Sequence, residues 1–282
     1  MAADELEALE EELRKGTKLV AMLAPCYVVD FDYPEVIGQL KELGFDKVVE
    51  LTFGAKMVNL EYHKLLEKSG GLVISATCPG VVDTVRREFP QYADNIARIY
   101  SPMVATAMIC KKIYPKHKTV FVSPCNFKKL EAKSAPGGCV DMAVDAAELH
   151  ALFDAHGIAP KEVHRKHAFD KFYNDYTKIY PTAGGLSKTA HLKGVLKPEE
   201  TLVIDGIAKV REFLKKPDPK IRFLDATFCI GACIGGPLLR KDITLAQKRK
   251  RVLAYVTRSL HESIADAKRG IAKDAKGLKF SY

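Results

Sequence analysis

The 282-residue sequence contains no tryptophan and no apolar run long enough to cross a bilayer. The missing tryptophan carries no functional information, whereas the missing apolar run argues against a membrane-spanning helix. A secretory or transit signal is also lacking, because residues 1–15 are acidic and helix-forming. We therefore expect a cytoplasmic protein with no membrane partner. Its seven cysteines then do not indicate a disulfide framework, and reduced thiols point to metal binding, catalysis or burial.

The formal net charge is +9, and four consecutive basic residues, 248–251, begin a helical pattern near the C-terminus. A basic run of this kind can dock an acidic electron carrier or nucleic acid. The pattern continues with Val252, Tyr255 and Val256 on an apolar face, so we interpret the run as the solvated side of a core-packed helix. No aromatic residue is interleaved with the basic ones, which disfavours nucleic acid as a partner.

Short apolar runs alternate with amphipathic patterns along the chain, which predicts an α/β fold with mostly parallel sheets flanked by helices. Residues 1–16 are expected to form a leader helix, 161–187 an irregular stretch, and 270–282 a frayed tail after the main domain, 17–269. No internal repeat or low-complexity linker interrupts this pattern. The predicted strands are 18–23, 46–51, 72–75, 119–122, 140–144, 202–204 and 221–224, and the predicted helices are 34–43, 79–88, 102–113, 146–155, 207–214 and 246–269.

Four cysteines lie in three short motifs that also contain small and turn-forming residues. Cys78, Cys125 and Cys229 each follow a predicted strand, and Cys233 is four residues beyond Cys229. In parallel sheets, ligands collect at the carboxyl ends of the strands. Glycine beside a cysteine lets the backbone and its N–H groups approach a bulky inorganic group. Because four thiolates are the usual protein ligands of a 4Fe-4S cluster, the motifs predict one such cluster.

Burial and zinc binding are the alternatives to an iron–sulfur cluster. Burial suits Cys110, which lies on an apolar helix face, and Cys139 is expected to be a loop thiol. Burial does not suit the glycine-flanked pair Cys229 and Cys233. Zinc also takes four cysteines, but structural zinc sites usually pair them in two short knuckles. Here only one pair is close in sequence, so the spacing favours an iron–sulfur cluster assembled between lobes.

Together the three motifs resemble the signature segments of the iron-iron (FeFe) hydrogenase catalytic domain, called the H-cluster domain. The chain reads Ser-Ala-Thr-Cys-Pro at 75–79, Pro-Cys-Asn-Phe-Lys-Lys-Leu-Glu at 124–131 and Cys-Ile-Gly-Ala-Cys-Ile-Gly-Gly at 229–236. The family segments have the forms Thr-Ser-Cys-Cys-Pro, Pro-Cys-x-x-Lys-Lys-x-Glu and Cys-x-Gly-Gly-Cys-x-x-Gly, in the same order. The resemblance covers roughly residues 17–260, and the combination is far more specific than any one segment.

The resemblance implies two α/β lobes with the H-cluster between them. That cofactor is a 4Fe-4S cluster joined through one cysteine to a diiron subcluster with carbonyl, cyanide and dithiolate ligands. By their places in the motifs, four residues resemble the 4Fe-4S ligands: Cys78, Cys125, Cys229 and Cys233. Of these, Cys233 resembles the ligand that bridges to diiron. Lys128 resembles the lysine that donates a hydrogen bond to a cyanide, which suits an ammonium group beside an anionic ligand.

The chain departs from the most efficient family members along the proton route. Thr77 stands where those enzymes have a cysteine that passes protons to the diiron site. A thiol has a pKa of about 8.5, whereas a hydroxyl is far less acidic, so we expect slower turnover. Ser101 matches a relay serine of the family, and Glu61 is the one acidic residue in the segment where the family has an acidic pair.

The expected diiron pocket is also altered. Pro25 and Cys26 resemble pocket-lining residues, and Cys26 replaces a residue that is often alanine or serine. Ser123 and Thr227 stand where methionines commonly pack around the diiron unit. The resemblance therefore implies a pocket that is more polar than in fast enzymes, with an altered potential and ligand exchange.

Several segments look closest to the sensory, low-activity branches of the family, which commonly lack the proton-passing cysteine. No Cys-x-x-Cys-x-x-Cys run precedes residue 78, so we expect electrons to come from an external carrier such as ferredoxin and maturation factors to install diiron. We favour a slow or sensory FeFe hydrogenase that interconverts H2 with protons and electrons. The alternative is a non-catalytic 4Fe-4S protein with an assembly or regulatory role, because eukaryotic hydrogenase-like assembly proteins share the four cysteines.

Overall fold

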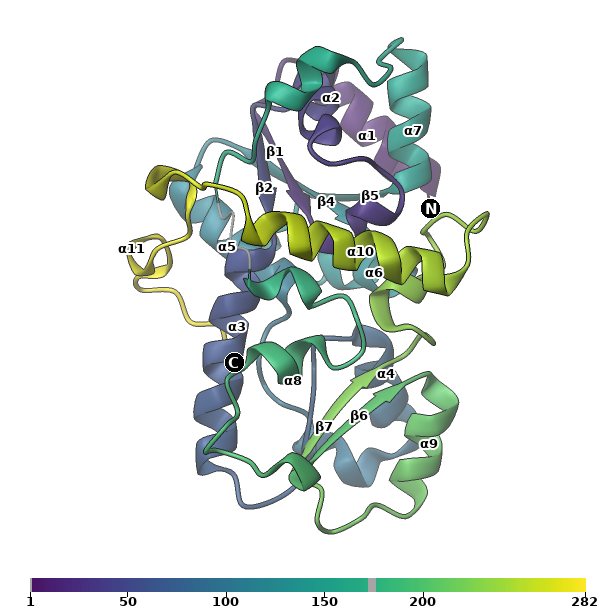
Figure 1. Cartoon of the computed structure of the whole chain (residues 1–282), viewed down its shortest axis with the longest axis vertical. Coiled ribbons are helices and arrows are strands. Elements are labelled where there is room, and N and C mark those ends of the chain that lie inside the picture. The colour runs from purple at the N-terminus through teal and green to yellow at the C-terminus, as the bar shows by residue number, and fades with distance from the viewer. Residues whose placement is uncertain (1, 172–175) are drawn as a thin grey trace.

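Two separate sheets carry the fold, one in each lobe (Figure 1). The computed structural model describes residues 2–171 and 176–282. Every pairing between the named strands is parallel, which confirms the predicted α/β class. The first sheet contains β1 (Leu19–Leu23), β2 (Lys47–Glu50), β4 (Lys118–Ser123) and β5 (Met142–Asp145) in the order β2-β1-β4-β5, and the second contains β3 (Val73–Ile74), β6 (Thr201–Asp205) and β7 (Phe223–Thr227) in the order β3-β7-β6.

Helices flank both sheets. The α-helices of the described residues are α1 (Ala2–Arg14), α2 (Glu35–Leu43), α3 (Thr52–Lys68), α4 (Pro79–Glu88), α5 (Pro102–Ile113), α6 (Asn126–Lys133), α7 (Ala146–Ala155), α8 (Gly185–Thr189), α9 (Ile207–Lys215), α10 (Leu245–Leu260) and α11 (Ala272–Ala275). In Figure 1, α1, α2 and α7 lie with the first sheet in the upper lobe, and α4, α8 and α9 lie with the second sheet in the lower lobe. Helix α10 crosses the view between the lobes.

Local sequence signals explain where several helices begin and end. Helix α2 ends before Gly44, whose φ of 118° is readily adopted only by glycine. Asp145 and Glu148 form a capping box at the start of α7, and Thr244 and Gln247 form another at the start of α10. The predicted starts of both helices therefore lie within one residue of the observed starts.

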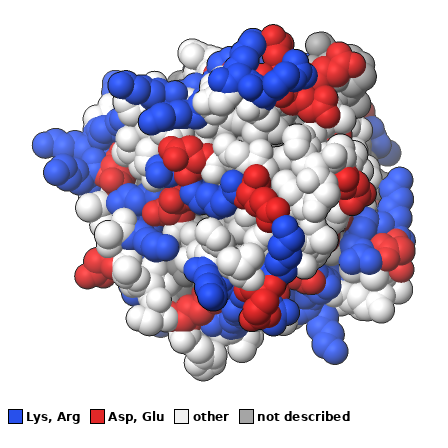
Figure 2. All heavy atoms as spheres, turned by 90° about the horizontal axis from the view of Figure 1, so that it is seen from above, with Lys and Arg blue, Asp and Glu red and all other residues white. Residues whose placement is uncertain are grey.

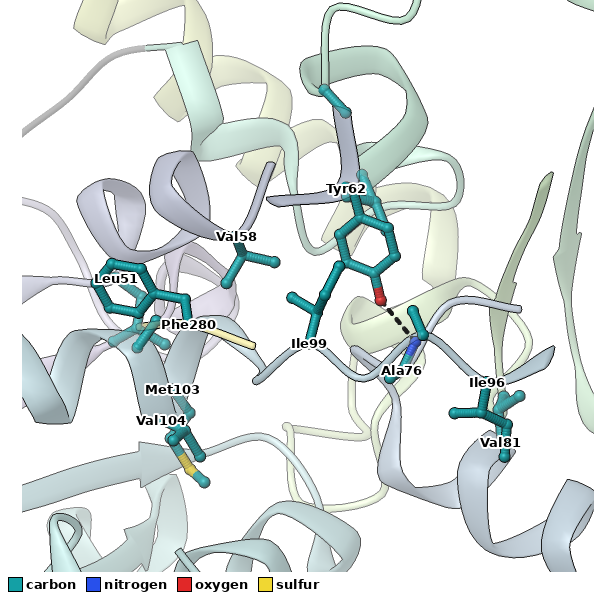
Figure 3. Close-up of a cluster of buried hydrophobic side chains, with 14 of the residues drawn as sticks. Leu51, Val58, Tyr62, Ala76, Val81, Ile96, Ile99, Met103, Val104 and Phe280 are labelled. Carbon is teal, nitrogen blue, oxygen red and sulfur yellow. Dashed lines mark hydrogen bonds between the residues drawn. The ribbon is translucent and has the colours of Figure 1, made fainter. Parts of the chain in front are cut away.

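A buried apolar cluster joins the second sheet to α3 and α5 (Figure 3). Tyr62 of α3 is fully buried, and its hydroxyl oxygen accepts a hydrogen bond from the backbone N–H of Ala76 at 2.7 Å. Val58 and Ile99 belong to the same cluster. Burial of each such large side chain contributes roughly 1.5–3 kcal/mol. The hydrogen bond fixes the backbone immediately before Thr77, so the core positions the first cysteine motif.

The expected fraying of the tail is wrong. Phe280 is 5% exposed and lies in the cluster of Figure 3, which also contains Leu51 and Val58. Ser281 forms an antiparallel bridge with Ile99. The buried ring of Phe280 and the backbone pairing of Ser281 thus hold the tail in place, although its composition is otherwise polar and rich in lysine.

The predicted helices need correction at three places: one ends early, and two observed helices were not predicted. Helix α10 ends at Leu260 rather than at residue 269. Helix α8 lies inside the stretch expected to be irregular, of which residues 172–175 lie outside the described residues. The sequence patterns did not indicate α3, because polar residues such as Asn59 are buried on it and its apolar side chains do not form one clean face.

The basic run 248–251 contributes to the fold. Lys248 is buried, and the Arg251 guanidinium donates to the backbone oxygen of Val28 at 2.6 Å. On the face drawn in Figure 2, lysine and arginine side chains alternate with aspartate and glutamate. Lys248 and Arg251 therefore pack against the protein, whereas Arg249 and Lys250 are exposed, so only part of the run forms the solvated side of the helix that the sequence predicts. Among the helices of the described residues, we find no candidate for a membrane span.

Candidate metal-cluster site

Three loops at the carboxyl ends of strands carry the four predicted ligands. Cys78 follows β3, Cys125 follows β4, and Cys229 and Cys233 follow β7. Cys78 and Cys125 occupy the N-cap positions of α4 and α6. The N-terminal end of a helix has unpaired N–H groups and a partial positive charge, so both positions favour a thiolate bound to an anionic cluster.

Glycines allow these loops to approach one another closely. A Cβ atom at Gly236 would lie 2.4 Å from the backbone oxygen of Pro124, and one at Gly80 would lie 2.8 Å from the ring of Phe127. The N–H of Leu238 donates to the same Pro124 oxygen at 3.3 Å. The loops after β4 and β7 are therefore in direct backbone contact, and the start of α4 packs against α6.

The four thiols are close enough to influence one another. The N–H of Phe228 donates to Sγ of Cys78 at 3.4 Å, which joins the first motif to the third. Burial, with smaller contributions from Cys78 and Cys229, raises the pKa of Cys125 to about 11. Burial, with charges of neighbouring cysteines, raises the pKa of Cys233 well above its ordinary value. Cluster binding must therefore displace protons from buried thiols.

The donor set of the site is four cysteine thiols from three separate loops. A zinc ion would need its sulfur ligands within about 2.3 Å of one point. A 4Fe-4S cluster binds each thiolate through a different iron, so its ligands stand further apart. The four thiols and the helix N-termini therefore fit a 4Fe-4S cluster.

A cavity lies beside Cys233, and its walls come from both lobes. Apolar side chains such as Leu51, Phe121 and Leu186 form much of the wall and are buried. The Thr227 hydroxyl also lies in the wall and is buried, with no hydrogen-bond partner among the described residues. A buried hydroxyl without a partner calls for a ligand or water that it can bond, so this cavity fits a group with polar ligands.

Lys128 brings a cation to the same cavity. It lies on α6 and is only 9% exposed, so it is not a solvated loop lysine. Its ammonium group donates to Oε2 of Glu131 at 2.5 Å. An ammonium group has three N–H donors, which leaves donors for an anionic ligand in the cavity.

Residues 17–237 match the family model of the iron-only hydrogenase large subunit, C-terminal domain. The chain belongs to this family. The fold comparison agrees with this assignment. A variant of [FeFe]-hydrogenase HydA1 from Chlamydomonas reinhardtii has a TM-score of 0.67 at 14% identity, over 95% of this chain and 91% of that one. The HydA(deltaEFG) structure, which describes stepwise [FeFe]-hydrogenase H-cluster assembly, has a TM-score of 0.65 at 15% identity, over 87% of this chain and 88% of that one.

Two curated relatives of this hydrogenase-family domain have different functions by name. Iron hydrogenase 1 of Clostridium pasteurianum is 23% identical over 256 residues, which are 72% of this chain and 44% of that protein. The cytosolic Fe-S cluster assembly factor NAR1 of Debaryomyces hansenii is 27% identical over 186 residues, which are 54% of this chain and 34% of that protein. The chain thus spans less than half the length of both relatives.

The other predicted site residues of the hydrogenase-family domain divide between the cavity and its surroundings. Thr77, Pro25 and Cys26 line the cavity. Ser123 is buried, and its hydroxyl donates to the backbone oxygen of Cys125 at 2.8 Å, so it supports the ligand loop. Ser101 lines a separate surface groove together with Glu131, and its buried hydroxyl has no partner in the part of the chain that the structure describes.

Sequence reasoning missed several cavity residues of this hydrogenase-family domain. Thr52 lines the cavity from the start of α3, Thr177 lines it from the 3-10 helix Tyr176–Ile179, and Tyr180 lines it from the residue after that helix. Asp225 lines it from β7 and is 4% exposed. The available signal was an acidic residue directly after the predicted strand 221–224, because a strand that continues by one residue would bury it, and buried carboxyls are rare without a partner or a function.

Proposed function

We propose that this chain binds an H-cluster and interconverts H2 with protons and electrons slowly, as a low-activity or sensory FeFe hydrogenase. Cys78, Cys125, Cys229 and Cys233 would hold the 4Fe-4S part, and the neighbouring cavity would hold the diiron subcluster. The observation that carries the proposal is that Lys128 reaches the cavity wall beside Cys233. A cluster-only protein has no evident use for a buried lysine in the wall of such a cavity.

When bound, the diiron subcluster would supply the redox-active metal at which protons and electrons meet H2. The residues of the chain would bind and orient it and control water and protons around it. Lys128 would donate to an anionic ligand, while Glu131 keeps the ammonium group oriented. The Thr227 hydroxyl would donate to a second polar ligand. The apolar wall around Leu51 and Phe121 would exclude bulk water.

Infrared spectroscopy of anaerobically purified protein, produced with hydrogenase maturation factors, tests this proposal. We expect bands from iron-bound carbonyl and cyanide ligands. Lys128→Met should shift the cyanide bands, because it removes the donor, whereas Lys133→Met on the exposed end of α6 should leave them unchanged. A filled 4Fe-4S site without carbonyl and cyanide bands would contradict the proposal.

Thr77→Cys is expected to raise the rate of H2 formation in the diiron-loaded protein. Thr77 lines the cavity, and a thiol there exchanges protons near neutral pH. Positioned acid–base groups contribute factors of roughly 10²–10⁴, which sets the upper range of the gain. The measurement is H2 evolution with a chemical reductant, and Thr77→Ser is the control that should give no gain. Equal rates for both variants would refute the importance of this position.

The second candidate function is that of a 4Fe-4S protein without diiron, acting in cluster assembly or regulation. The similarity to the NAR1 assembly factor specifically favours this alternative. It needs the four cysteines but not Lys128 or Thr227. Under this alternative, Lys128→Met would leave the iron and sulfide content of the loaded protein unchanged.

We also propose that maturation factors install the diiron unit and that an acidic external carrier, such as a ferredoxin, exchanges electrons with the cluster. Ile230, next to Cys229, is 71% exposed, so this ligand loop reaches the surface. The Asp205 carboxylate accepts from the N–H of Gly231 at 2.6 Å and pairs with exposed Lys209 at 3.7 Å. A lysine this close to the ligand loop suits an acidic partner.

A further inference from the structure

Asp225 is a buried carboxyl group at the wall of the cavity. It lies on β7, four residues before Cys229, and is 4% exposed. Its Oδ2 atom accepts a hydrogen bond from the backbone N–H of Ser187 at 2.9 Å. Ser187 lies on α8 and is partly exposed to solvent. The pair therefore spans the wall from the cavity to the outside of the protein.

The burial of Asp225 disfavours the charged form of its carboxyl. Burial raises the pKa of this carboxyl, whereas the hydrogen bonds from Ser187 and the charge of Lys188 act in the opposite direction. Tyr62 and Tyr180 are near enough to Asp225 to interact with it electrostatically, and burial raises the pKa of both phenols, so neither supplies a negative charge near neutral pH. Unlike the Glu50 carboxylate, which pairs with buried Lys178, Asp225 forms no ion pair with any residue that the structure describes and accepts a hydrogen bond from Ser187.

We propose that Asp225 carries protons into and out of the cavity, in the role that Thr77 cannot fill, and that Ser187 links it to solvent. This inference rests on the proposed hydrogenase function. The carboxyl O–H gives its proton to an acceptor in the cavity and becomes a carboxylate. The Ser187 hydroxyl, which donates to the backbone oxygen of Gly184 at 3.1 Å in this structure, then turns to that carboxylate, returns a proton to it and takes one from water. No electrons move in these steps, and reversal of both steps serves H2 oxidation.

The first test measures the proton on Asp225 without any need for diiron. A folded acid with a raised pKa binds a proton that the unfolded chain has released, so the folded state loses stability as pH rises from about 4 to the folded pKa. In that pH range, the ratio of the unfolding equilibrium constant of wild type to that of Asp225→Asn should rise by up to tenfold per pH unit. Glu212→Gln, on the exposed side of α9, should show no such difference from wild type. A pH-independent difference for Asp225→Asn would overturn the proposal.

The second test measures proton delivery in the diiron-loaded protein. Asp225→Asn should lower H2 evolution by about 10²-fold or more with its carbonyl and cyanide bands retained. Asp225→Glu should keep part of the rate, Ser187→Ala should fall between, and Thr77→Cys should restore activity to the Asp225→Asn protein. Unchanged activity in Asp225→Asn, or no rescue by Thr77→Cys, would overturn the proposal. Absence of carbonyl and cyanide bands in wild type would instead count against the hydrogenase function, while the unfolding test would still decide whether Asp225 holds the proton.

Discussion

Replacing Lys178 with methionine is expected to lower the free energy of unfolding by about 3–5 kcal/mol. Lys178 and Glu50 are both completely buried, and their Nζ and Oε2 atoms are 2.6 Å apart. The Tyr255 hydroxyl donates to Oε1 of Glu50 at 2.6 Å, and the Thr52 hydroxyl donates to Oε2 at 3.2 Å. Removing the ammonium group would leave a buried carboxylate without its countercharge, which neighbouring hydroxyls only partly compensate.

The loss should depend on pH in a defined direction. Burial raises the pKa of Glu50, and Lys178 opposes this shift, so the variant should have a still higher folded pKa. A raised folded pKa means that the stability of the folded state falls as pH rises between the unfolded and folded values. The Lys178→Met protein should therefore differ most from wild type at neutral pH and least near pH 4.5, the ordinary value for glutamate.

Denaturant unfolding of two control variants makes this prediction specific. Lys161→Met removes an ion pair with Glu42 of the same 2.6 Å length, but the Lys161 side chain is 47% exposed, so we expect a change below about 1 kcal/mol. The double variant Glu50→Leu/Lys178→Met removes both charges and should recover much of the lost stability. Similar losses from Lys178→Met and Lys161→Met would show that burial does not determine the strength of this pair.

The buried pair also explains how a short 3-10 helix can form part of the cavity wall. Lys178 anchors the helix Tyr176–Ile179 to Glu50 at the end of β2. The neighbouring Thr177 hydroxyl donates to the backbone oxygen of Thr52 at 2.7 Å, and both threonines line the cavity. An interaction outside the cavity thus fixes the position of two residues in its wall.

Most helices and strands could be predicted because their ends depend on residues within the same short segment of sequence. The end of α2 at Gly44 and the start of α4 at Pro79 each depend on one residue with a restricted or permissive backbone. The position of the tail depends instead on Phe280 reaching a distant apolar cluster, which composition cannot reveal. Helix α3 depends on a close approach at Gly54, where a Cβ atom would lie 2.1 Å from Thr106 of α5.

In the site, the positions of the cysteines could be predicted from the sequence, whereas the directions of the side chains around them could not. Cys78, Cys125 and Cys229 follow strands, so the rule for parallel sheets brings them together. The direction of a side chain after a strand is not a local property, and Ser123 points back to its own ligand loop rather than into the cavity. Asp225 faces the cavity because β7 is the central strand of its sheet and runs to the boundary between the lobes.

Gly236→Ala is expected to weaken the hold on the cluster by about tenfold or more. The added Cβ atom would lie 2.4 Å from the backbone oxygen of Pro124 and 2.9 Å from that of Cys233. Neither oxygen belongs to a flexible side chain, so the loops carrying Cys125 and Cys233 must separate. Overpacking of this kind costs about 1–3 kcal/mol, and about 1.4 kcal/mol is tenfold in an equilibrium constant.

Iron and sulfide retained after a chelator challenge measure this effect, with the absorbance of the cluster followed in parallel. Gly71→Ala is the matched control, because a Cβ atom at Gly71 meets nothing within 4 Å, and it should retain iron as wild type does. Cys229→Ser, which removes a ligand, should lose iron regardless of packing. If Gly236→Ala retained iron like the control, the close contact between the loops would not be needed to assemble the cluster, and the four cysteines alone would suffice.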